Sequence, residues 1–139
     1  MSQHYQNLLN QLGQKIEIYQ ELADLLKKEW DCIAEYSLEE LQEILVRKEH
    51  LLLQSQMVEE NRNKIIGQLA DELKIPQEEL TLSKLIAARK YPLAQKLEDS
   101  RDRLLELISL IGDLSLKNKN LIEHSSLSLK KSLAFIHCV

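Results

Sequence analysis

The four histidines are the residues of this chain best suited to bind a metal, but their neighbours do not complete a metal site. A di-iron centre in a helical bundle needs Glu-x-x-His on two helices, together with two further inward carboxylates. The residues three positions before His50, His124 and His137 are an arginine, a leucine and an alanine. The sequence therefore predicts neither a metal site nor a bound cofactor.

Nucleophilic catalysis and phosphate binding are also poorly supported. Asp31 and Glu35 lie close to Cys32, and negative charge raises the pKa of a thiol instead of activating it. The three glycines are isolated from one another, so they cannot form a phosphate-binding loop. Cys32 and Cys138 are too few for a disulfide framework, and we expect two reduced thiols, as in a cytosolic protein. We expect no catalytic residues, and hence no enzyme.

Charge and hydropathy narrow the possible partners. The net charge is −4, and Lys and Arg are interleaved with Glu and Asp, which argues against binding to nucleic acid. No apolar run is long enough to span a membrane, and the first residues do not resemble a secretory signal. We therefore expect a cytoplasmic protein whose partners are other proteins.

The strongest pattern is a ladder of apolar residues at alternating spacings of four and three, which is typical of one face of a long helix. It consists of Tyr5, Leu9, Leu12, Ile16, Tyr19, Ala23, Leu26, Trp30 and Ile33. We expect a helix over residues 2–35. The sequence Ser37-Leu38-Glu39-Glu40 then has the form of a capping box, which predicts a tight turn into a second, antiparallel helix over residues 38–73.

The second helix carries a row of polar residues at seven-residue intervals. Lys48, Ser55 and Arg62 are in line with Leu41 and Leu69. The row either lies at the edge of the apolar face with its stems directed outward, or forms a polar layer inside the bundle. The edge is favoured, because an unpaired buried charge is costly.

Pro76 interrupts the helical pattern after the second helix. Thr81 is then a suitable N-cap for a short helix over residues 82–90, which Pro92 ends and which we expect to cap the bundle. A last long helix is expected over residues 93–123, followed by an amphipathic tail over 124–139, where serines weaken the helical preference. Together these elements predict a single all-α domain over residues 1–139, an antiparallel bundle of three to four helices.

The last helix is more apolar than contact with two neighbours requires. Its face includes Leu97, Leu104, Ile108, Ile111, Ile122, Leu129 and Ile136, and further apolar residues widen it: Leu105, Leu107, Leu110, Leu114, Leu116 and Leu121. Three explanations remain open: the segment closes a bundle, it forms a groove for a partner helix, or it mediates self-association.

Several short motifs occur in an order that resembles the FlgN-type flagellar export chaperones. They are Lys48-Glu49 followed by Leu51-Leu52, Asn61-Arg62, Leu73-Lys74-Ile75-Pro76, Thr81-Leu82-Ser83-Lys84-Leu85-Ile86, and Asn118-Lys119-Asn120-Leu121-Ile122. The similarity spans residues 9 to 136.

The resemblance implies a bacterial cytoplasmic chaperone of type III secretion. Such proteins bind the C-terminal helical segments of the hook-associated (hook–filament junction) proteins, keep them from polymerising, and deliver them to the flagellar export gate. The family's binding region corresponds here to Leu114, Leu121, Ile122, Leu129, Leu133 and Ile136. We interpret the motif residues as structural: they would form a surface salt bridge, part of a polar layer and a helix cap. These residues are Lys48, Glu49, Arg62 and Thr81. Asn118, which occupies a position on the apolar face of the last helix, is interpreted in the same way. We expect the free protein to be a monomer or a weak dimer; the alternative is a coiled-coil adaptor that self-associates through the same apolar stripe.

Overall fold

The computed structural model describes the backbone of residues 2–88 and 93–138 and the side chains of residues 3–87 and 93–124. Its elements are α1 (Ser2–Glu35), α2 (Leu38–Leu73), the 3-10 helix η1 (Gln77–Glu79), α3 (Leu82–Ala88) and α4 (Leu93–Cys138). The described backbone contains no strand, so the predicted all-α class is confirmed. The bounds of α1 and α2 coincide with the expected ranges.

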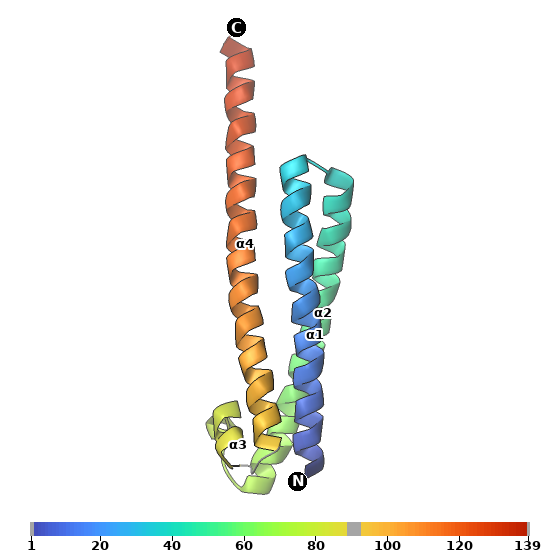
Figure 1. The fold of residues 1–139 in the computed structure, drawn as a ribbon, viewed down its shortest axis with the longest axis vertical. Helices are drawn as coiled ribbons and strands as arrows, with labels where there is room; N and C mark the ends of the chain where they lie inside the picture. Colours follow the sequence, from blue (N-terminus) through green and yellow to red (C-terminus); the bar gives the residue numbers. More distant parts are fainter. Residues whose placement is uncertain (1, 89–92, 139) are drawn as a thin grey trace.

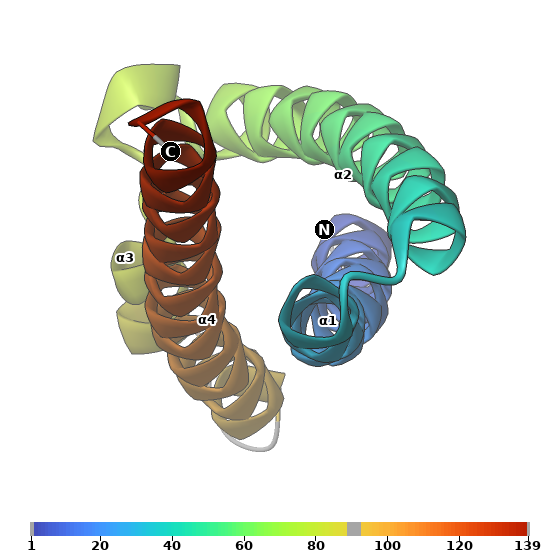
Figure 2. The ribbon, with the colours of Figure 1, turned by 90° about the horizontal axis from the view of Figure 1, so that it is seen from above.

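Helix α1 lies between the other two long helices (Figures 1 and 2). It packs against α2 on one side and α4 on the other, whereas α2 and α4 make no close backbone contact in the part of the chain that the structure describes. Helix α2 runs antiparallel to α1. Helix α4 runs parallel to α1, because Arg103 contacts Gln20 and Asn118, further along α4, contacts Glu29, further along α1.

The turn between α1 and α2 is closed by backbone groups. Tyr36 adopts a left-handed conformation with φ 56°. The Ser37 N–H donates to the Cys32 carbonyl at 2.9 Å, and the Tyr36 N–H donates to the Ile33 carbonyl at 3.3 Å, which is a Schellman motif. The Ser37 side chain makes no capping hydrogen bond, so the predicted capping box is wrong. Glu40, its expected second half, instead accepts a hydrogen bond from the Cys32 thiol at 3.6 Å.

The end of α2 repeats this geometry before Pro76. Lys74 has φ 56°, and the Ile75 N–H donates to the Ala70 carbonyl at 3.1 Å. The chain then passes through η1 to Thr81, whose hydroxyl accepts the Lys84 N–H at 3.1 Å, as expected of an N-cap. Helix α3 packs against the first part of α4 at one end of the molecule (Figure 1). Residues 89 and 90 of the expected short helix lie outside the described residues.

Two apolar clusters hold the long helices together. The larger lies near the N-terminus of α1 and consists of Tyr5, Leu8, Leu12, Ile65, Leu69, Ala70, Leu80, Leu85, Leu97 and Leu104. The smaller is centred on Leu22, Leu26 and Leu51. Trp30, expected in the α1 seam, is 38% exposed, while its neighbour Glu29 is only 5% exposed. The buried face of α1 is therefore rotated from the predicted one near its C-terminal end.

Helix α4 is continuous in the backbone from Leu93 to Cys138, so the segment expected as an amphipathic tail is helical as far as Cys138. Asn118 lies beside Glu29, which is six residues before the end of α1, so α4 passes the end of α1 at about His124. The remaining residues, over roughly 20 Å at 1.5 Å per residue, extend beyond the α1–α2 turn. Figure 1 shows this segment projecting alone at the end opposite α3.

Candidate functional site

The described part of α4 uses one apolar face to pack on α1. Leu97, Leu104 and Leu107 are buried, and Ile111 and Leu114 pack against the Leu22–Leu26 cluster. Leu114, which was predicted to bind a partner, is therefore partly buried by contacts within the molecule.

Large apolar side chains of the described part of α4 also remain exposed to solvent. Leu105, Ile108, Leu116 and Ile122 are all exposed. Ile108 and Ile122 belong to the apolar face expected of the last helix, and they remain exposed because α4 packs closely on α1 and not on α2. Among the predicted binding residues, Leu121 is half-buried and Ile122 is 46% exposed. The side chains of Leu129, Leu133 and Ile136 lie outside the described residues, on the projecting segment.

Helix α2 also exposes large apolar side chains. They are Leu38, Leu45, Val46, Leu52, Leu53 and Met57. Because α4 does not approach the backbone of α2, no helix in the described structure covers this stretch on the side away from α1. The molecule therefore has apolar surface available on both outer helices.

A series of hydrogen bonds joins the three long helices close to the point where α4 passes the end of α1. The Asn118 amide N–H groups donate to the Leu26 carbonyl at 2.8 Å and to the Glu29 carboxylate at 2.9 Å. The other Glu29 oxygen accepts from the Lys48 ammonium at 3.0 Å. Asn118 is 2% exposed, so two of the family-motif residues meet at a buried acid that belongs to α1. The salt bridge predicted for Lys48 exists, but its partner is Glu29 and not Glu49, which is exposed.

Glu29 was missed by the sequence analysis. The alternating spacing of four and three that placed Trp30 on the buried face fits a second set of residues equally well. That set is Leu22, Leu26, Glu29 and Ile33. One acid, Glu29, stands among the apolar residues of that set, and one asparagine, Asn118, stands among those of α4. Such isolated polar residues on apolar faces could have indicated a buried polar contact between the two helices.

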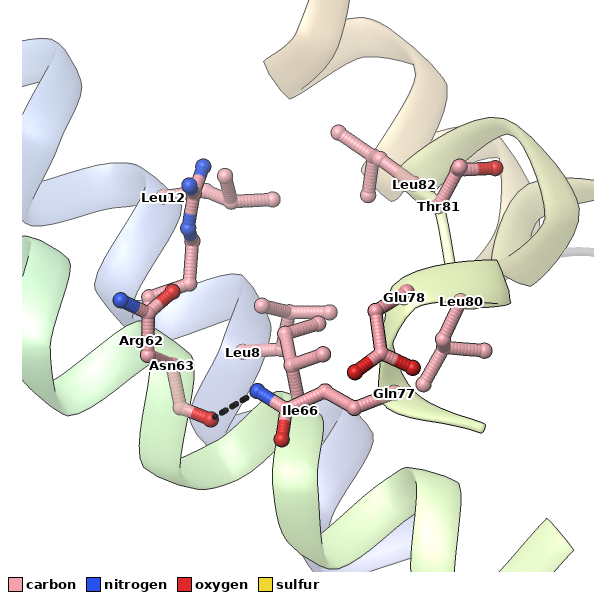
Figure 3. Close-up of a pocket in the computed structure, with 10 residues that line it drawn as sticks. All are labelled: Leu8, Leu12, Arg62, Asn63, Ile66, Gln77, Glu78, Leu80, Thr81 and Leu82. Carbon is pink, nitrogen blue, oxygen red and sulfur yellow. Dashed lines mark hydrogen bonds between the residues drawn. The ribbon is translucent and has the colours of Figure 1, made fainter. Parts of the chain in front are cut away.

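The remaining motif residues lie at the opposite end of the molecule. Arg62 and Thr81 line opposite sides of a hollow of about 560 Å³ between α1, α2 and the η1–α3 segment (Figure 3). Arg62 forms an ion pair with Glu59, which also accepts from Lys15 of α1 at 2.8 Å. Partial burial opposes ionisation of Glu59, but the hydrogen bond from Lys15 and the charge of Arg62 outweigh it and lower its pKa below the ordinary value. These ion pairs connect side chains of α1 and α2, and Arg62 is half-buried.

The Cys32 thiol, considered above as a nucleophile, lies near three acidic side chains. Burial raises the pKa of the Cys32 thiol, and the hydrogen bond to Glu40 and the charges of Glu40, Glu35 and Asp31 raise it further. Among the residues that the structure describes, no group of three or more His, Cys, Asp or Glu side chains is placed to hold a metal. None of the described helices is both long and apolar enough to cross a membrane.

Exposed apolar surface on the outer helices of an open bundle is typical of a protein that binds other proteins. The chain matches the family model described as FlgN protein over residues 1–138, and it therefore belongs to the FlgN family. FlgN proteins are flagellar export chaperones, so this chain is a chaperone of flagellum assembly. Comparisons with curated proteins and with solved structures gave no significant match.

Proposed function

We propose that this chaperone binds the C-terminal helical segments of the hook–filament junction proteins in the bacterial cytoplasm and delivers them to the flagellar export gate. The projecting end of α4 is the main binding element. Family membership supports the general role, and the arrangement of α4 supports the location.

The observation that carries this proposal is that none of the described helices lies beside the α4 backbone after about His124 (Figure 1). The sequence of that segment is apolar at Leu129, Leu133 and Ile136. Soluble proteins seldom leave such a stretch uncovered without a use. Ile122 continues the same surface into the part of α4 that lies alongside α1.

The energetics suit a reversible complex. An amphipathic cargo helix laid on this surface would bury apolar area at roughly 25 cal/mol per Å². Part of that gain would be offset by the ordering of the cargo segment, as in coupled folding and binding. Covering the apolar faces of the cargo would also prevent the contacts through which junction proteins polymerise.

The test is co-purification of the junction proteins with a double variant, Ile122→Asp with Leu129→Asp. Ile122 is preferred to Leu121 because it is the more exposed of the two. We expect loss of co-purification with unchanged helix content. The matched control is Leu105→Asp with Ile108→Asp, which places the same charges on exposed positions of the same helix next to α1. Binding that survives the first variant, or is lost equally in the control, would contradict the proposed location.

Self-association is the second candidate, because exposed apolar residues on α2 and α4 could also meet those of another copy. Sedimentation of the free protein separates the two: we expect a monomer at micromolar concentration, and a tight dimer that dissociates in the Ile122 and Leu129 variant would favour the adaptor.

A further inference from the structure

The hydrogen-bonded residues that join the three long helices, Glu29, Lys48 and Asn118, line a cavity. The cavity has a volume of about 320 Å³ and receives residues from each of these helices. Leu26 and Glu29 come from α1, Lys48 comes from α2, and Asn118 and Ile122 come from α4. The floor of the cavity is therefore formed by α1 and its sides by α2 and α4, which make no close backbone contact with each other in the described structure.

The orientation of the Asn118 side chain is determined by its partners. Both of its hydrogen bonds are to acceptors, the Leu26 carbonyl and the Glu29 carboxylate, so the nitrogen must face them. Its oxygen Oδ1 is then directed elsewhere, is shielded from solvent, and has no hydrogen-bond partner among the residues that the structure describes. A buried acceptor without a donor is unfavourable, because it has lost its hydrogen bonds to water. The free chaperone thus carries one unmet hydrogen bond beside the cavity.

We propose that Asn118 determines which cargo helix binds and in what register, by accepting a hydrogen bond from an amide side chain, Asn or Gln, within the apolar face of that helix. This rests on the proposed function and assigns one residue of the binding surface a specific role. The outer wall of the cavity includes the exposed side chains of Lys119 and Ile122, which an incoming helix would displace to reach the oxygen.

The charges around the cavity favour an amide over a cation. Two lysines, Lys48 and Lys119, line it with two acids, Glu29 and Glu123, and the acid nearest Asn118 is already paired with Lys48. A cargo Lys or Arg would approach like charges while the buried acid is already neutralised. An amide can donate to Asn118 Oδ1 while its own oxygen accepts from an ammonium group, since Lys48 uses one N–H for Glu29.

A polar contact of this kind discriminates more than it stabilises. A single asparagine in an apolar helical interface specifies register and partner, because every misaligned arrangement leaves its polar atoms unpaired. Apolar contacts along the rest of α4 would tolerate a shift of one turn, whereas a hydrogen bond to Asn118 would not.

The experiment compares wild type with Asn118→Leu, using the full chaperone and the full-length junction proteins of the same bacterium. Dissociation constants come from titration calorimetry, and thermal unfolding of each free chaperone is the control for structure. We expect binding to weaken about tenfold or more, which corresponds to about 1.4 kcal/mol, while the free variant still unfolds cooperatively above the temperature of the binding measurement. Equal affinity of the two chaperones would overturn the proposal.

The cargo side provides a second test that does not depend on the stability of the variant chaperone. Each Asn and Gln in the C-terminal helical segment of the cargo is changed in turn to Leu. We expect one position at which the change weakens binding to the wild type about tenfold and at which Asn118→Leu causes no further loss, the result of a coupled pair. The absence of any such position would overturn the inference and leave the cargo assignment intact. A wild-type chaperone that binds no junction protein would overturn both.

Discussion

The family-motif residues differ in what surrounds their charges. Lys48 meets a buried carboxylate, and Arg62 neutralises a half-buried one, whereas Glu49 lies in solvent. The sequence alone indicated that these positions were structural, but it could not indicate Glu29 as the partner of Lys48. Partners on different helices depend on register, which the spacing of apolar residues leaves ambiguous by one position.

Replacing Lys48 should be costly, because Glu29 would remain buried with Asn118 as its only remaining side-chain partner among the contacts described. We expect Lys48→Met to lower the free energy of unfolding by about 2 kcal/mol, measured in urea. Glu49→Gln, the adjacent control, should change it by less than about 0.5 kcal/mol. Equal effects of the two substitutions would show that the Lys48–Glu29 pair does not stabilise the bundle.

The ion pairs of Glu59 make a predictable contribution to the pH dependence of stability. Its pKa is lowered in the folded protein, so the ionised form stabilises the fold at pH values above the unfolded pKa of about 4.3. That contribution is lost as the pH falls through the folded pKa. Glu59→Gln should therefore be less stable than wild type at pH 7, by less than about 1 kcal/mol because the pair is partly exposed, and nearly equal to it at pH 3. Urea unfolding at the two pH values measures this, and a difference that grows on acidification would contradict the assignment.

At the scale of the elements, some helix ends were predicted from a proline or a capping side chain, whereas others depend on backbone geometry. Pro76 and Thr81 mark the connection between α2 and α3 in the sequence and act there in the structure. Ser37 does not act as a side-chain cap, because the left-handed Tyr36 closes the preceding helix with backbone hydrogen bonds. A left-handed tyrosine has no clear sequence signal, since glycine or asparagine is usual at that position.

The Thr81 cap provides a prediction for the short connection. Thr81→Ala removes the acceptor for the Lys84 N–H and should lower the free energy of unfolding by about 1 kcal/mol. Thr81→Ser keeps the hydroxyl and should be nearly neutral. Urea unfolding of both variants checks the role, and an alanine variant as stable as the serine variant would show that the hydroxyl contributes nothing.

At the scale of the whole molecule, the helical class and the excess of apolar residues in the last helix followed from the sequence, but the packing did not. The patterns of α2 and α4 are both compatible with a closed bundle. The parallel packing of α4 on α1, separate from α2, depends on the α3 connection, which lies at the end where α1 begins, so that α4 starts from that end (Figure 1). That arrangement leaves Ile122 exposed and carries α4 beyond the α1–α2 turn.

The central claim is that cargo binds along the last part of α4, and hydrogen exchange of the backbone amides tests it most directly. Amides after about residue 124 should exchange faster in the free chaperone than those of α1, because none of the described helices lies beside that part of the α4 backbone. Addition of a full-length junction protein should slow exchange over residues 118–138, with little change in α1 and α3. Slowed exchange confined to α2, or to the hollow beside Arg62 and Thr81, with residues 118–138 unchanged, would contradict the account.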